Sequence, residues 1–187
     1  MRTIGLIGGM SWQSSKLYYE RINQLVAERR GGATSAQIII NSLDFAPIAR
    51  MQTEGRWKDA AAHLANAAQA LERAGADVIA IGANTMHKVA SQVMASVHVP
   101  LIHIGDTLVA GLRGHARSRP LLLGTRYTME DPFMIDHLAN KGIGALVPDK
   151  ADREALHAII YDELIKGVVT DKSRETVLAM IERSSAR

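Results

Sequence analysis

Short apolar runs alternate along the chain with longer stretches in which hydrophobic residues recur at helical spacing. Runs rich in Ile, Leu and Val predict strands at residues 3–7, 37–43, 77–81, 99–104, 119–125 and 144–148. Amphipathic or alanine-rich stretches between them predict helices at residues 14–30, 57–74, 86–95, 106–114, 132–141, 152–166 and 172–183. Strands that alternate with helices in this way are typical of βαβ units. The pattern therefore predicts an α/β protein with parallel sheets.

The alternation starts again near residue 115, where a second series of strand-like runs begins. We therefore expect two Rossmann-like α/β domains with parallel sheets, over residues 1–114 and 115–187. The first has four predicted strands and the second has two. The sequence stops directly after a predicted helix, where an alternating fold would continue with a strand. We therefore expect the second domain to be incomplete.

Composition narrows the class of protein. The 187 residues are 47% hydrophobic, which is enough for a real core and argues against disorder. No apolar run approaches the roughly 18 residues that cross a bilayer, and no signal-peptide pattern opens the chain, so we expect a cytoplasmic protein without a membrane partner. The sequence contains no cysteine, which excludes disulfides, thiolate metal sites and a cysteine nucleophile within it.

Charge gives little indication of a macromolecular partner. The net charge is only +3, and the basic residues are spread along the chain with small groups at 29–30 and 113–119. Aromatic residues make up 4% of the sequence. Because nucleic-acid binding needs a clustered basic surface with groove-reading or stacking residues, we expect no nucleic-acid partner.

Polar groups follow three of the predicted strands, in the segments Gly8–Trp12, Ala83–His87 and Gly124–Met129. Ligands of open parallel sheets bind outside the carboxyl ends of the strands, so these segments predict a pocket for a small anion. A structural strand-to-helix turn at the first segment, and helix capping by Asn84 and Thr85 at the second, are the alternatives. The spacing of the early glycines does not match the dinucleotide-binding fingerprint.

Together and in this order, the three segments resemble the aspartate/glutamate racemase family, and most closely its broad-specificity amino-acid racemase branch. The resemblance extends over essentially all 187 residues, including Asp44-Phe45, Trp57 and residues 160–164. It implies two α/β domains related by pseudo-twofold symmetry, with the substrate between them and no cofactor. One thiol would remove the α-proton, and a second thiol from the other domain would return a proton on the opposite face.

In this sequence, the resemblance places the first acid/base group at Ala83, whose methyl group cannot transfer a proton. The second belongs to a Gly-Cys-Thr-Glu motif on a strand past the last helix, and the sequence ends before it, so we expect a shortened and impaired copy. The alternative is a catalytically inactive protein that binds a small dicarboxylate or amino acid. The resemblance implies substrate contacts at Met10, Ser11, Gln52, Asn84, Thr85, Thr125, Tyr127, Thr128 and Lys166.

Single residues have alternative interpretations. Lys166 could bind a carboxylate or simply be a solvated lysine favoured by a helix dipole. His87 could be a general base or a structural histidine, and Tyr127 could meet a ligand or pack. No His, Asp and Glu spacing indicates a metal site. Because an incomplete second sheet would leave apolar surface uncovered, we also expect a homodimer.

Overall fold

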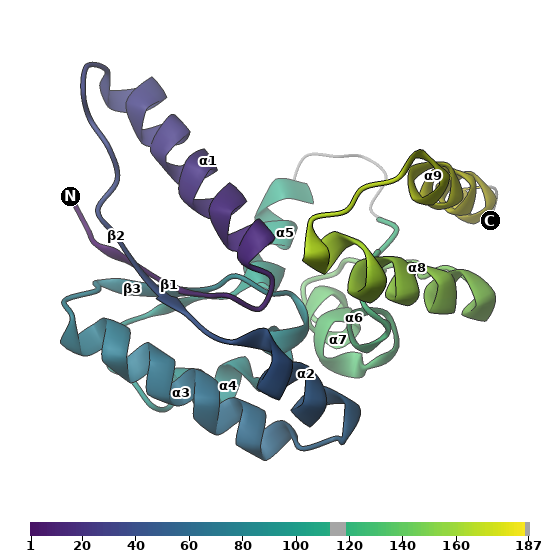
Figure 1. Cartoon of the computed structure of the whole chain (residues 1–187), viewed down its shortest axis with the longest axis horizontal. Coiled ribbons are helices and arrows are strands. Elements are labelled where there is room, and N and C mark those ends of the chain that lie inside the picture. The colour runs from purple at the N-terminus through teal and green to yellow at the C-terminus, as the bar shows by residue number, and fades with distance from the viewer. Residues whose placement is uncertain (113–118, 186–187) are drawn as a thin grey trace. The chain divides into compact units, whose positions relative to one another are not determined.

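The computed structural model describes residues 1–112 and 119–185 of the chain (Figure 1). Its residues form two compact units, Met1–His103 and Ile104–Arg187. The domain boundary expected between residues 114 and 115 falls within 113–118 and so lies outside the described residues.

The first unit is built on a parallel sheet of four strands. These are β1 (Ile4–Gly8), β2 (Ile38–Ser42), β3 (Val78–Ile81) and β4 (Leu101–Ile102), in the order β2-β1-β3-β4. All three pairings are parallel, and Ile7 of β1 is opposite Ile81 of β3. The predicted α/β class and its parallel sheet are therefore confirmed. The fourth strand is shorter than the pattern predicts.

The helices of this unit lie on both sides of the sheet. Figure 1 shows α1 (Trp12–Arg30) on one side, and α3 (Trp57–Arg73) and α4 (Ala90–Met94) on the other. A 3-10 turn, η1 (Thr85–Val89), connects β3 to α4. Helix α2 (Phe45–Thr53) was not predicted, and it begins where the Asp44 carboxylate accepts a hydrogen bond from the Ala46 N–H at 3.0 Å.

Small residues bring α3 close to the sheet. The buried positions of α3 are Ala60, Ala61, Leu64, Ala67, Ala68 and Leu71, so four of the six are alanines. On the facing strand, a Cβ added to Gly5 would lie 2.8 Å from the Cβ of Ala76 and 3.1 Å from that of Leu71. Only glycine therefore permits this separation between α3 and β1.

The second unit is mainly helical in its described residues. It contains α5 (Ile104–Leu112), α6 (Arg126–Glu130), α7 (Pro132–Ala139), α8 (Lys150–Asp162), η2 (Leu164–Lys166) and α9 (Asp171–Ser185). The strands predicted at 119–125 and 144–148 are represented by one parallel bridge between Leu121 and Leu146. The helix predicted over 152–166 divides at Glu163 into α8 and the short turn η2.

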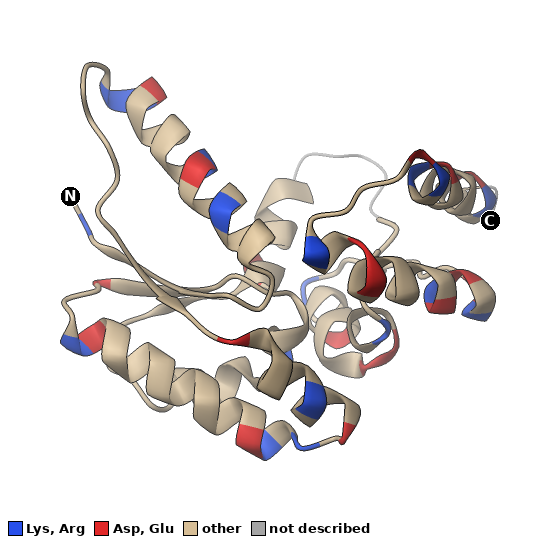
Figure 2. Ribbon diagram, viewed as in Figure 1, with Lys and Arg blue, Asp and Glu red and all other residues tan. Residues whose placement is uncertain are grey.

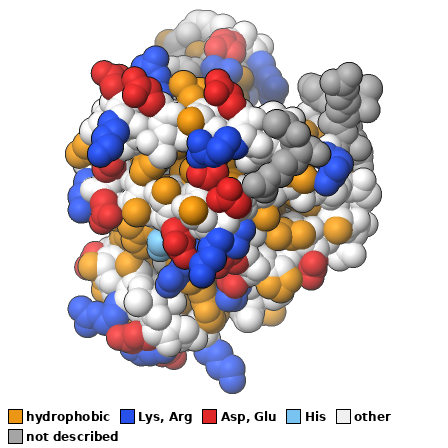
Figure 3. Space-filling model, turned by 90° about the vertical axis from the view of Figure 1, so that its right-hand side faces the viewer, with side chains coloured by type: hydrophobic (Ala, Val, Ile, Leu, Met, Phe, Trp, Pro, Cys, Tyr) orange, Lys and Arg blue, Asp and Glu red, His pale blue; other side chains and the backbone are white. Residues whose placement is uncertain are grey.

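Acidic and basic residues are interspersed along the helices (Figure 2). The face shown in Figure 3 likewise carries Lys and Arg side chains next to Asp and Glu, with hydrophobic side chains between them. None of the helices in residues 1–112 and 119–185 combines the length and the apolar character of a bilayer-crossing segment.

Candidate functional site

The carboxyl end of β1 is a tightly built turn. Gly9 has a φ of +84°, and a Cβ at this position would overlap the carbonyl oxygen of Leu43. The buried Ser15 hydroxyl accepts a hydrogen bond from the Gly9 N–H at 2.9 Å and donates to the Ser11 carbonyl at 3.2 Å. The Ser11 hydroxyl caps α1 by accepting from the Ser14 N–H at 3.4 Å. The turn is thus held by its own side chains, and Ser11 lies at the start of a 19-residue helix.

The carboxyl end of β3 lies beside this turn, because β1 and β3 are neighbours and the Gly82 N–H donates to the Ile7 carbonyl at 2.9 Å. Ala83 is half-buried, Asn84 is exposed and Thr85 is buried. Asn84 has helical dihedral angles and makes no capping hydrogen bond with its side chain. The capping alternative is therefore wrong for Asn84, whose amide is exposed at the edge where two polar strand ends meet.

His87 is fixed beneath this segment. Its Nδ1 lies 3.0 Å from the Ala83 carbonyl oxygen, so the neutral ring carries its proton on Nδ1 and donates it there. Its buried Nε2 has no hydrogen-bond partner among the described residues. Burial, with a smaller contribution from the neighbouring His103 imidazole, lowers the pKa of His87 to about 4. A neutral imidazole thus holds the carbonyl of the residue at the expected acid/base position.

Three of the predicted substrate contacts in this unit have buried side chains, namely Met10, Gln52 and Thr85. Met10 belongs to the hydrophobic core. Gln52 of α2 is 3% exposed and its amide donates to the Met86 sulfur at 3.0 Å. The Lys88 ammonium lies 4.0 Å from the centre of the Trp57 ring, a cation–π contact that joins η1 to the start of α3. Met10 and Gln52 thus both contact the hydrophobic core of the first unit.

Three of the predicted contacts of the second unit gather at the start of α6. The Thr125 hydroxyl caps α6 by accepting from the Thr128 N–H at 3.4 Å, and it lies 3.4 Å from the Thr128 hydroxyl. Thr128 is fully buried, and Tyr127 is half-buried. The Tyr127 hydroxyl accepts a hydrogen bond from the Arg126 guanidinium at 3.1 Å. The segment therefore brings hydroxyl groups and a cation together.

A group on α8 packs against this segment, and the sequence patterns did not single it out. The His157 ring meets the Tyr127 ring edge-on at 5.9 Å and the Tyr161 ring at 4.5 Å. The Arg126 backbone N–H donates to His157 Nδ1 at 3.4 Å. Burial raises the pKa of Tyr161 to about 12, and burial together with the nearby Arg126 charge lowers the pKa of His157. The four-residue spacing of His157 and Tyr161 on one helix was the available signal.

Lys166 lies at the end of η2 and is exposed. The turn that carries it is anchored by Glu163, whose carboxylate accepts from the Ser173 hydroxyl at 2.7 Å and from the Thr170 hydroxyl at 3.1 Å. Gly167 follows with a left-handed φ of 77° and ends the turn. Because Lys166 lies on this separate turn and not on α8 itself, a helix dipole gives little reason for its position.

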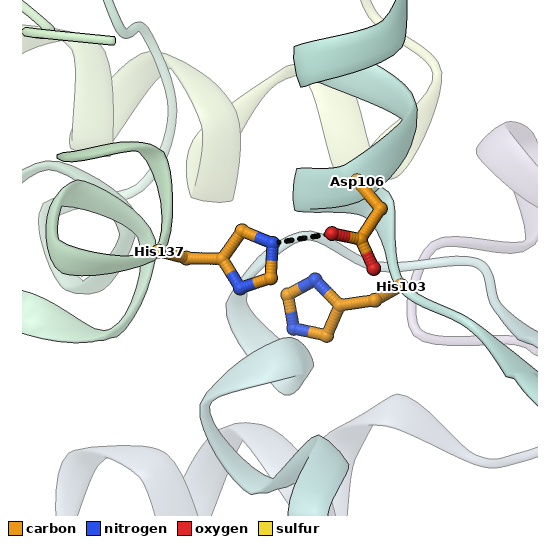
Figure 4. A group of neighbouring side chains, drawn as sticks. All are labelled: His103, Asp106 and His137. Carbon is orange, nitrogen blue, oxygen red and sulfur yellow. Dashed lines mark hydrogen bonds and ion pairs between the residues drawn. The ribbon is translucent and has the colours of Figure 1, made fainter. Parts of the chain in front are cut away.

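One further pair of titratable groups lies within the second unit. Figure 4 shows His137 of α7 and Asp106 of α5 pointing toward one another, with Nε2 and Oδ1 2.9 Å apart. His103, also drawn, is the last residue of the first unit.

The predicted contacts are thus divided between the units. Met10, Ser11, Gln52, Asn84 and Thr85 lie in the first unit, and Thr125, Tyr127, Thr128 and Lys166 lie in the second. Within the first unit, Ser11 and Asn84 follow neighbouring strands. Within the second, Tyr127 and Thr128 lie in α6, and Thr125 is the N-cap residue of this helix.

Comparison with known proteins gives consistent matches. The Asp/Glu/Hydantoin racemase family matches residues 7–187. The structure of a candidate Asp/Glu racemase from Yersinia pestis is 45% identical with a TM-score of 0.89, over 100% of this chain and 81% of that chain. An aspartate racemase homologue from Pyrococcus horikoshii is 36% identical with a TM-score of 0.75, over 92% and 75%. Picrophilus torridus aspartate racemase, 18% identical with a TM-score of 0.77 over 100% and 78%, supports the fold alone.

Proposed function

Because the chain belongs to the Asp/Glu/Hydantoin racemase family, we propose that it binds a small amino acid or dicarboxylate, and that Ala83 leaves it impaired in cofactor-independent racemisation. Two-base racemisation needs one acid/base group on each face of the α-carbon, within hydrogen-bonding reach. A methyl group at position 83 supplies none. Binding does not depend on that group, so the two activities separate in this chain.

The main support for the proposal is that the backbone after β3 is well formed, although the side chain at position 83 cannot transfer a proton. The Gly82 N–H donates a hydrogen bond to the Ile7 carbonyl, and the Ala83 carbonyl accepts one from the His87 ring. Ala83 is partly accessible beside the exposed Asn84. An ordered backbone with an inert side chain at this position is what we expect of a binding site that lacks its acid/base residue.

Several of the predicted contact groups in each unit suit a carboxylate. Hydroxyl, amide and ammonium groups all donate to ionised carboxylates, and donors that carry charge form the stronger bonds. The first unit offers Ser11 and Asn84, and the second offers Thr125, Tyr127 and Lys166. Lys166 is exposed and has no salt bridge to any described residue. A ligand with a carboxylate would therefore gain most from Lys166.

Two measurements on the same sample test the proposal. L-aspartate and L-glutamate are titrated into the protein by calorimetry, and the α-proton of each is followed by NMR in D2O. We expect saturable binding without exchange above a no-protein control. Lys166→Met should weaken binding, whereas Lys172→Met, which removes an exposed lysine of α9, should not. Exchange well above the control would show that another group transfers the proton, and absence of binding would overturn the proposal.

Restoring a thiol tests the two-base requirement. Ala83→Cys supplies an acid/base group on one face of the α-carbon only, so we expect its racemisation to stay close to that of the unmodified chain. Circular dichroism or chiral chromatography measures conversion of L-aspartate to D-aspartate. Rapid conversion by this variant would show that the chain already contains a second proton donor.

We further propose that the chain self-associates as a homodimer. Helix α1 exposes large apolar or aromatic side chains at Trp12, Leu17 and Tyr19, and exposed patches of this kind commonly mark protein–protein contacts. Light scattering should give twice the chain mass. A stable monomer across micromolar concentrations would contradict this.

A further inference from the structure

We propose that His157 is a positioning residue that fixes the Thr125–Thr128 segment, and with it the Tyr127 hydroxyl, for a carboxylate ligand. This inference rests on the proposed function, since it concerns the same ligand. Nothing in the family resemblance assigned His157 a role. Its basis is the set of contacts that joins α8 to the start of α6.

His157 holds the segment through its backbone. Its Nδ1 accepts the Arg126 N–H at 3.4 Å, so the neutral ring carries its proton on Nε2. Arg126 directly precedes Tyr127, and a bond to its N–H restricts the backbone from which the tyrosine side chain projects. The His157 imidazole therefore acts on the orientation of Tyr127 without touching a ligand itself.

Two aromatic contacts keep the His157 ring in place. The Tyr161 ring lies 4.5 Å away at an angle of 48°, one helical turn further along α8. On the other side, the Tyr127 ring meets His157 at 88°, an edge-to-face arrangement that aromatic rings favour. Because α8 is a regular helix of 13 residues, it provides a rigid base for these contacts.

The guanidinium of Arg126 completes the arrangement. It donates to the Tyr127 hydroxyl at 3.1 Å and lies 5.0 Å from the centre of the Tyr127 ring. The backbone of Arg126 is thus tied to His157 while its side chain is tied to Tyr127. Loss of the His157 contact would release the backbone end of this arrangement.

The contact depends on the protonation of His157. A protonated ring has N–H groups on both nitrogens, so Nδ1 can no longer accept the Arg126 N–H. The charged and titratable groups around the ring are Arg126, Glu130 and Tyr127 from α6, and Tyr161 and Asp162 from α8. Arg126 opposes protonation of the ring, whereas Glu130 and Asp162 favour it. Acid should therefore loosen the segment as His157 takes up its proton.

Replacement by asparagine separates the hydrogen bond from the titration. In His157→Asn, the amide oxygen can take the place of Nδ1 as acceptor and does not titrate. In His157→Phe, the ring is retained but the acceptor is lost. His63→Asn, at an exposed position of α3, is the control for the loss of a histidine. All four proteins are compared as full chains, with L-aspartate and L-glutamate as ligands.

Binding and the amide resonance of Arg126 are measured between pH 7.5 and pH 5. In the unmodified chain, the Arg126 amide shift should follow the His157 imidazole titration, and ligand affinity should fall with it. His157→Phe should bind about three- to tenfold more weakly at pH 7.5, the effect of one hydrogen bond. His157→Asn should retain affinity and lose the pH dependence, whereas His63→Asn should behave as the unmodified chain.

Two results would overturn the inference while leaving the proposed function intact. One is an Arg126 amide shift that does not follow the His157 titration. The other is ligand affinity in His157→Phe equal to that of the unmodified chain. If the unmodified chain binds neither ligand at any pH, the proposed function fails, and the positioning role fails with it.

Discussion

The buried His87 imidazole should make the protein less stable as the pH falls from 7.5 to 5. Its pKa is lowered from 6.5 to about 4, chiefly because burial disfavours the charged ring. The unfolded chain has no such burial and takes up a proton near pH 6.5. Between these values, the unfolded state binds more protons than the folded state, so the free energy of unfolding decreases as the pH falls.

The size of the effect follows from the same two pKa values. One pKa unit corresponds to about 1.4 kcal/mol, so the full difference is roughly 3 kcal/mol and is complete below pH 4. At pH 5, the unfolded histidine is mostly protonated and the folded one mostly neutral, which gives a loss of about 2 kcal/mol relative to pH 7.5. Above pH 7, both forms are neutral and the contribution disappears.

Urea denaturation at pH 7.5 and pH 5 measures the decrease in the free energy of unfolding. Comparison with His87→Asn shows how much of that decrease comes from His87. Asparagine can still donate to the Ala83 carbonyl but does not titrate. The unmodified chain should lose about 2 kcal/mol more than His87→Asn between the two pH values. His63→Asn, at an exposed site on α3, should lose as much as the unmodified chain.

Equal losses in the unmodified chain and in His87→Asn would refute the reasoning. Such a result would mean that His87 is protonated in the folded protein at pH 5, or that its ring reaches water there. If His87→Asn is too unstable to measure, His87→Phe fills the site with a ring that does not titrate, and the same comparison applies.

Two further predictions concern the supports of the fold. Gly9→Ala should destabilise the chain by roughly 1–3 kcal/mol more than Gly55→Ala, because both need positive φ but only the first would overlap a neighbouring backbone. Urea midpoints compare the two, and equal values would contradict the close packing at Leu43. Arg183→Met should lower the melting temperature more than Arg174→Met, because Arg183 pairs with the largely buried Asp152 and the partner of Arg174 is exposed. Calorimetric scans test this, and the reverse order would refute it.

The strands of the first unit were predictable because their apolar runs are short, continuous and bounded by polar or glycine residues. Helix α2 was missed because it has only nine residues and carries Pro47 in its first turn. A proline there is compatible with a helix, since the first N–H groups need no internal partner. The prediction of one helix over 152–166 was wrong at its end. Glu163 is bound by Ser173 and Thr170, and this tertiary contact ends the periodic stretch early.

The strand-end segments of the site were predictable from topology, since parallel strands bring their carboxyl ends to one edge. Other features depend on how elements pack. The buried His87 Nε2, which has no hydrogen-bond partner in residues 1–112 and 119–185, and the hydrogen bond between Arg126 and His157 both result from the packing of one element against another. Sequence spacing could place His157 and Tyr161 on the same face of one helix, but it could not identify the partner of His157 on another element.

The alanine-rich face of α3 has a consequence for which substitutions the first unit tolerates. Alanines fill four of its six buried positions, so truncating these four removes little surface, and the usual loss from shortening a core side chain is small there. Enlarging these side chains is the damaging change, because Leu71 of α3 leaves too little space for even a Cβ atom at Gly5 of β1. In a saturation mutagenesis screen, this interface should accept Ala and Gly and reject Val, Leu and Phe, the reverse of the preference at a leucine-filled core.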